Sequence, residues 1–181
     1  MKKEAKPAVR KSHSFPSCKE GGTAPRAVGC AKKSDVAKTS REVLNSMRLE
    51  ITAASANENF ARTAVAAFAS QLDPTIDEIN DLKTAVSEAV TNSIVHAETK
   101  SVFIEATLWQ EQLTRGIHVK ITDFGIGIAN IEKALEPFFT TKPNEERSGM
   151  GFTVMQSFMD SLCVKNGRDC GTVVEMTKTF G

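Results

Sequence analysis

Apolar and polar residues alternate in several short segments of this chain, and a period of two is typical of β-strands that bury one face. The alternation is clearest at Val102, Ile104, Ala106 and Leu108, and it predicts a strand over 101–110. Similar patterns predict further strands over 48–53, 116–123, 162–166 and 172–179, the last two as a hairpin.

Two longer segments repeat their apolar residues every three or four positions, which predicts amphipathic helices. The first covers about 55–71 and should place Phe60 on its buried side. The second covers about 75–96. Its start at Thr75, with Glu78 three residues later, has the signature of a capping box.

A shorter helix is predicted over 151–158, so that the expected order is β-α-α-β-β-loop-α-β-β. Helices that precede and interrupt neighbouring strands favour one helix layer on one sheet face. We therefore predict an α/β (α+β) two-layer sandwich with a mixed, mainly antiparallel sheet.

Charge divides the chain into two parts. Of its 181 residues, 40% are hydrophobic and 25% are charged, which suits one packed domain with a tail and excludes disorder of the whole chain. Residues 1–46 carry eleven Lys or Arg against four Asp or Glu, and residues 47–181 carry twelve against eighteen. Because 1–46 also has few apolar residues, we expect a basic, mostly disordered extension with a short helical piece around 35–45, followed by one domain over 47–181.

Several classes of protein are disfavoured by composition. No apolar run approaches the roughly 18 residues that cross a bilayer, and no apolar block follows the charged N-terminus, so we expect a cytoplasmic protein without a membrane partner. The basic segment lacks interleaved aromatic residues, so no direct nucleic-acid partner is predicted. The four cysteines form no C-x-x-C pair, and their spacing does not predict a zinc site.

Three polar residues of the long predicted helix, Glu88, Asn92 and His96, share one stripe because they are four residues apart. A glutamate can orient or deprotonate a hydroxyl nucleophile. An asparagine offers a neutral oxygen to a hard cation such as Mg²⁺. Taken alone, the stripe is more typical of a solvated helix face.

A D-x-G-x-G pattern, formed by Asp123, Gly125 and Gly127, directly follows a predicted strand. Glycines there allow the backbone to approach a ligand closely, and the aspartate can accept a hydrogen bond from an exocyclic amine. A tight turn would explain the same pattern. Thr172, which opens the last strand, could reach a base or could be an ordinary strand residue.

The segment between these motifs, about 131–148, is long and polar toward its end, which suits a lid over a nucleotide. It contains Phe-Thr-Thr-Lys-Pro at 139–143 and leads into Arg-Ser-Gly-Met-Gly-Phe at 147–152. Glycines that open a helix expose backbone N–H groups to phosphate. The spacing is that of neither a P-loop nor a dinucleotide-binding βαβ unit.

In their order along the chain, these motifs resemble the Bergerat-fold ATPases, a superfamily that includes gyrase and the histidine kinases, over about 47–179. Within it, the segments 55–75, 87–92 and 139–152 are similar to the sporulation anti-sigma-F factors, a family of serine kinases. The resemblance implies a homodimer that binds Mg·ATP and inhibits sporulation sigma factor F. It also implies phosphorylation of a serine of an anti-anti-sigma factor.

The resemblance also implies roles for individual residues. Glu88 would be the catalytic base, Asn92 the Mg²⁺ ligand and Asp123 the acceptor for the adenine amine. Arg62 and Arg147 would dock the protein partners. The remaining ATP-binding positions would be Gly125, Gly127, Thr140, Thr141, Lys142, Ser148, Gly149, Met150, Gly151 and Thr172.

The chain departs from this family at three places. His96 is followed by only a short turn over 97–100, and Phe124 stands where an acidic residue is common. The basic segment 1–46 has no counterpart in the family pattern. Two other functions stay open on the sequence. One is a related switch kinase that serves a stress-response sigma factor. The other is a nucleotide-dependent sigma-binding module without kinase activity.

Overall fold

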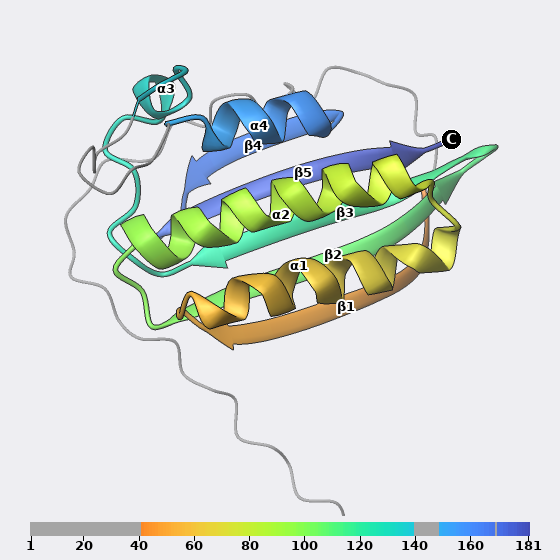
Figure 1. The fold of residues 1–181 in the computed structure, drawn as a ribbon, viewed down its shortest axis with the longest axis horizontal. Coiled ribbons are helices and arrows are strands. Elements are labelled where there is room, and N and C mark those ends of the chain that lie inside the picture. Colours follow the sequence, from red (N-terminus) through yellow and green to blue (C-terminus); the bar gives the residue numbers. More distant parts are fainter. Residues whose placement is uncertain (1–40, 140–148, 169) are drawn as a thin grey trace, which may run out of the picture.

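The computed structural model describes residues 41–139, 149–168 and 170–181. In these ranges the chain forms a five-stranded sheet with its main helices packed against one face (Figure 1). The elements in chain order are β1 (Glu42–Thr52), α1 (Ala56–Ala69), the 3-10 helix η1 (Ser70–Leu72), α2 (Ile76–His96), β2 (Ser101–Glu111), β3 (Thr114–Asp123), α3 (Ile131–Ala134), α4 (Gly151–Phe158), β4 (Ser161–Asn166) and β5 (Thr172–Phe180).

The strands follow the order β1-β2-β3-β5-β4, and every pairing among them is antiparallel. The predicted two-layer α/β architecture is confirmed. The sheet has no parallel pair among the described strands, so the mixed character we expected is not seen there.

The first strand is longer than predicted, because β1 begins at Glu42 and not near residue 48. Residues 42–46 are therefore part of the sheet, so the domain begins before the boundary expected at Met47. The prediction of a short helix around 35–45 is wrong for residues 42–45, which form a strand. The reason is that β1 is an edge strand whose residues 42–46 are exposed, so no apolar alternation marks them. The rest of the predicted extension, residues 1–40, lies outside the described residues.

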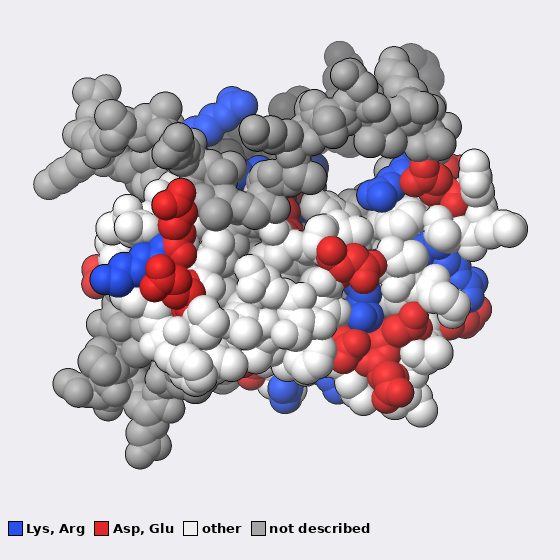
Figure 2. Space-filling view, turned by 90° about the horizontal axis from the view of Figure 1, so that it is seen from above, with Lys and Arg blue, Asp and Glu red and all other residues white. Residues whose placement is uncertain are grey.

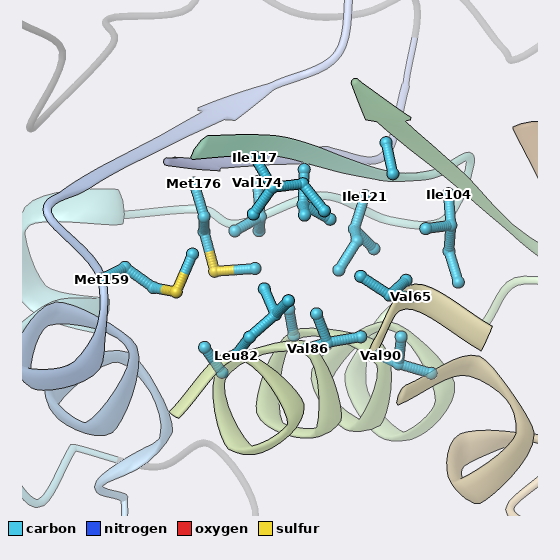
Figure 3. Close-up of a cluster of buried hydrophobic side chains, with 14 of the residues drawn as sticks. Val65, Leu82, Val86, Val90, Ile104, Ile117, Ile121, Met159, Val174 and Met176 are labelled. Carbon is cyan, nitrogen blue, oxygen red and sulfur yellow. The ribbon is translucent and has the colours of Figure 1, made fainter. Parts of the chain in front are cut away.

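A single layer of apolar side chains joins the helices to the sheet (Figure 3). Val86 and Val90 project from α2, and Ile104 and Ile121 project from β2 and β3; all four are at most 1% exposed. Burial of such side chains stabilises the folded chain by about 1.5–3 kcal/mol each. α2 is thereby fixed along the middle of the sheet.

The start of α2 is fixed by the predicted capping box, which is confirmed. The Thr75 hydroxyl accepts from the Glu78 N–H at 3.3 Å, and the Glu78 carboxylate accepts from the Thr75 N–H at 2.7 Å.

None of the helices in the described ranges is long and apolar enough to span a membrane.

On α1, the prediction that Phe60 is buried is wrong, since its side chain is 54% exposed. The buried positions are Ala61, Val65, Ala66 and Ala69, and three of them are spaced four residues apart. Small side chains at this spacing allow close approach of two helices, and this packing determines which face of α1 is turned inward.

The far end of α4 is tied to α2 by a buried lysine. Lys178, which is 8% exposed, donates to the Asp81 carboxylate at 3.0 Å and to the Phe158 carbonyl at 2.8 Å. α2 and α4 run side by side (Figure 1), so this contact leaves the N-terminus of α4 beside the C-terminal half of α2.

Candidate functional site

A cavity of about 550 Å³ opens between the C-terminal half of α2, the end of β3 and the N-terminus of α4. Most of the described site residues predicted from the sequence meet there. The cavity wall includes Glu88, Asn92, Asp123, Gly127, Gly149, Met150, Gly151 and Thr172.

The other predicted residues divide into two groups. Gly125 is described but does not line the cavity, and Arg62 lies on α1, where its guanidinium contacts Asn59 and Glu58 at 3.1 and 3.7 Å. The predicted positions that lie outside the described residues are Thr140, Thr141, Lys142, Arg147 and Ser148.

Gly151 brings the N-terminus of α4 directly against the polar stripe of α2. A Cβ atom at this glycine would lie 3.0 Å from a carboxylate oxygen of Glu88 and 3.4 Å from the amide nitrogen of Asn92. A larger residue would therefore fill the space between the two helices. The carboxylate and the carboxamide therefore lie beside the N-terminus of α4, where the first N–H groups have no partner within their own helix.

Gly149 allows the chain to turn just before α4, because its φ of 65° lies in the left-handed region that glycine tolerates best. Its carbonyl accepts from the Phe138 N–H at 3.0 Å. The described residues on either side of the segment 140–148 are thus hydrogen-bonded to each other beside the cavity.

Asp123 is buried at the end of β3 and is only 2% exposed. One of its carboxylate oxygens accepts from the backbone N–H groups of Gly125 and Thr172 at 3.1 and 3.0 Å, and the other from the Ser93 hydroxyl at 3.2 Å. Burial raises the pKa of Asp123 above its usual value, and these three hydrogen bonds oppose the rise.

The three hydrogen bonds of Asp123 leave its carboxylate with limited capacity to accept a hydrogen bond from a ligand. One oxygen already accepts two hydrogen bonds, whereas the oxygen that Ser93 contacts has acceptor capacity left. Because Asp123 lines the cavity, its carboxylate can accept one further N–H from a bound molecule. The exocyclic amine of a purine is such a donor.

The short turn after His96 packs directly on the Asp123 turn. This is the turn at which the sequence departs from the pattern of the family that it resembles. The Ala97 carbonyl accepts from the Ile126 N–H at 2.8 Å, and a Cβ at Gly125 would lie 1.7 Å from that carbonyl oxygen. Phe124 turns away and packs edge-on against Phe103, with the ring centroids 5.4 Å apart. Gly125 is therefore required for packing beside the cavity.

Sequence reasoning missed two residues that organise the site, Ser93 and Asn166. Ser93 is 4% exposed and lies one turn beyond Ala89 on the buried stripe of α2. A hydroxyl among apolar residues could have indicated a buried hydrogen bond at this position. Asn166 ends β4 and hydrogen-bonds with its side chain to Ile128. No spacing in the sequence connects these two distant positions.

Several known proteins are similar to this chain in sequence. Residues 51–178 match the model of the histidine kinase-like ATPase domain family. The chain is 54% identical over 138 residues to an anti-sigma F factor of Clostridium perfringens. The aligned region covers 74% of this chain and 96% of the relative. It is 56% identical over 140 residues to an anti-sigma F factor of Clostridium beijerinckii, covering 75% of this chain and 95% of the relative.

Among solved structures, the fold is similar to the RsbU and RsbW domains of a Mycobacterium tuberculosis protein. The TM-score is 0.52 at 12% identity, over 76% of this chain and 33% of that one. This likeness concerns the fold alone. With more than half of their residues identical over nearly the whole length of the relatives, the sequences decide the family: the chain belongs to the anti-sigma F factors, within the histidine kinase-like ATPase domain family.

Proposed function

We propose that this chain is an anti-sigma factor and an Mg·ATP-dependent serine/threonine-protein kinase. It would bind and inhibit sporulation sigma factor F and phosphorylate a serine of the anti-anti-sigma factor. The observation that carries the proposal is the meeting of Glu88, Asn92 and the α4 N-terminus on one wall of a cavity that also contains Asp123.

Asp123 would select the base. Its remaining acceptor position lies in a buried setting where water competes poorly, so a purine amine would gain a charge-assisted hydrogen bond. Gly127 and Thr172 would form the adjacent wall. The glycine permits close approach of the ligand, and the threonine hydroxyl adds a second polar contact to the base.

The phosphates would lie toward α4. The backbone N–H groups at Gly149, Met150 and Gly151 would bind phosphate oxygens, together with the positions that lie outside the described residues: Thr140, Thr141, Lys142 and Ser148. Asn92 would hold Mg²⁺ through its carbonyl oxygen, and its neutral side chain beside a carboxylate fits a hard cation. When bound, the cation would supply neutralisation of phosphate charge.

Glu88 would hold the serine hydroxyl in line with the γ-phosphorus and accept its proton. A bond forms between the serine oxygen and the γ-phosphorus, and the bond to the bridging β,γ-oxygen breaks to release ADP. Phosphoryl transfer depends mainly on alignment and charge stabilisation, which a carboxylate beside a helix N-terminus can provide.

The protein partners would dock away from the base. We propose a homodimer, with Arg62 on α1 and Arg147, which is not among the described residues, as contacts for the sigma factor and the anti-anti-sigma factor. No direct contact with nucleic acid is proposed. In Figure 2 the described surface facing the viewer carries interspersed acidic and basic side chains around a largely uncharged centre, and no continuous basic stripe is visible there.

The decisive experiment is an incubation of the purified full chain with ATP labelled in the γ-phosphate, Mg²⁺ and the candidate anti-anti-sigma protein. Labelled phosphoserine supports the kinase. ATP binding without transfer would favour a nucleotide-dependent sigma-binding module. Transfer to the anti-anti-sigma protein of a stress-response system, and none to the sporulation one, would favour the related switch kinase.

Asn92→Ala should weaken the binding of Mg·ATP by about tenfold or more, because the cation loses a ligand. Metal-free ATP should bind the variant and the unmodified chain about equally. Calorimetric titration with and without Mg²⁺ measures both affinities. Equal affinity of the two proteins for Mg·ATP would contradict the metal assignment.

A further inference from the structure

The side chain of Asn166 makes two hydrogen bonds to one residue of the cavity wall. Its carbonyl oxygen accepts from the Ile128 N–H at 2.8 Å, and its amide nitrogen donates to the Ile128 carbonyl at 2.9 Å. A backbone segment is thus held as it would be by a neighbouring strand, although only one side chain is involved.

The opposite strand of the same hairpin holds the other end of this wall. Asn166 and Thr172 are partners in the β4–β5 pairing, and the Thr172 N–H donates to Asp123 at 3.0 Å. The hairpin turn is closed by the Gly167 N–H and the Gly171 carbonyl at 2.9 Å. The residue pair Asn166–Thr172 of the hairpin therefore holds both Ile128 and Asp123 by hydrogen bonds.

The segment between these two points is the cavity wall on the base side. Ile126, Gly127, Ile128 and the next two residues all line the cavity. Gly127 has a φ of 73°, and a Cβ there would lie 3.0 Å from the Asn166 carbonyl oxygen. The glycine thus allows the backbone and the Asn166 side chain to approach each other closely.

From this arrangement we infer that Asn166 is a positioning residue for nucleotide binding. By clamping Ile128, it holds the 126–128 wall at a fixed distance from Asp123, and so it preorganises the base side of the cavity. Asn166 does not line the cavity and acts only through Ile128. The inference rests on the proposed function, because it assumes that a nucleotide binds there.

The chemistry of the clamp requires a carboxamide. Alanine at 166 removes both hydrogen bonds. An aspartate has nearly the same shape and can still accept from the Ile128 N–H, but its second oxygen would face the Ile128 carbonyl without a proton between them. Asn166→Asp therefore tests the bonding separately from the volume.

The experiment titrates ADP into the full chain and into Asn166→Ala, Asn166→Asp and Lys165→Ala, each with and without Mg²⁺. Lys165 is the matched control, since it is the neighbouring residue on β4 and pairs with Glu175 at 2.9 Å. Amide hydrogen exchange of residues 124–130 is measured on the same proteins without nucleotide, because the loss of the clamp should speed exchange at Ile128.

We expect both Asn166 variants to bind ADP about tenfold more weakly, and Lys165→Ala to stay within about twofold of the unmodified chain. The loss should be the same with and without Mg²⁺, since the clamp lies on the base side. Exchange in 124–130 should quicken in the Asn166 variants alone. A purely stabilising role would lower the melting temperature and leave the ADP affinity of the folded protein unchanged.

Unchanged ADP affinity in Asn166→Ala, in a chain that itself binds ADP, would overturn the clamp and leave the proposed function standing. A loss seen only with Mg²⁺ would also overturn it, because the effect would then lie at the metal. Failure of the unmodified chain to bind any nucleotide would overturn the proposed function, and the inference with it.

Discussion

Glu88→Gln is expected to lower phosphoryl transfer by about a hundredfold to ten-thousandfold while Mg·ATP still binds. The amide keeps the shape of the side chain that faces Gly151, but it cannot accept the proton of the incoming serine. Single-turnover transfer to the anti-anti-sigma protein measures the loss, and calorimetric titration measures the ATP affinity.

The matched control is Glu50→Gln, which makes the same chemical change at an exposed position on β1. Its transfer rate should stay within about twofold of the unmodified chain. A Glu88→Gln protein that transfers phosphate at the normal rate would remove Glu88 from its role as the base. One that no longer binds Mg·ATP would show that Glu88 acts in binding and not in the transfer step.

The parts of the fold that sequence reasoning predicted are those with a strong local signal. The capping box at Thr75 and the long apolar stripe define α2 by themselves, and strict alternation defines β2 and β3. With α2 along the sheet, the stripe of Glu88 and Asn92 lies beside Gly151 of α4 and lines the same cavity as Asp123 at the end of β3. The convergence of these motifs could therefore be anticipated from their order.

The parts that were missed depend on contacts between distant residues. The exposed start of β1 has no apolar pattern, and its strand conformation comes from pairing with β2. The inward face of α1 is set by packing on α2, which favours Ala61 over the larger Phe60. The bonds of Asn166 to Ile128 join the end of β4 to the segment after β3, and neither segment alone predicts them.

Asp123→Asn is expected to weaken ATP binding by about a hundredfold. The amide oxygen can replace the carboxylate oxygen that accepts from Gly125 and Thr172. The amide nitrogen then faces Ser93 and the cavity, so a donor would meet the adenine amine. ITP, which carries a carbonyl oxygen in place of that amine, should be disfavoured less than ATP. Competition titrations with the two nucleotides measure the change in preference.

The same substitution should not destabilise the nucleotide-free chain. Because burial raises the pKa of Asp123 in the folded state, its ionised form opposes folding above that pKa, and this penalty is lost as the pH falls through it. Asparagine removes the penalty at every pH. The free energy of unfolding of Asp123→Asn should therefore equal or exceed that of the unmodified chain near neutral pH, and the difference should shrink on acidification.

Asp77→Asn, at an exposed position in the first turn of α2, is the control for the ATP titrations and should leave ATP affinity unchanged. Denaturant unfolding at neutral and acidic pH, paired with the ATP titrations, separates the two effects of Asp123. A chain that keeps its ATP affinity with asparagine at 123 would contradict the role of this carboxylate in selecting the base. A variant that loses both stability and affinity would mean that Asp123 acts mainly as the structural anchor of the β3 turn, through its bonds to Gly125 and Thr172.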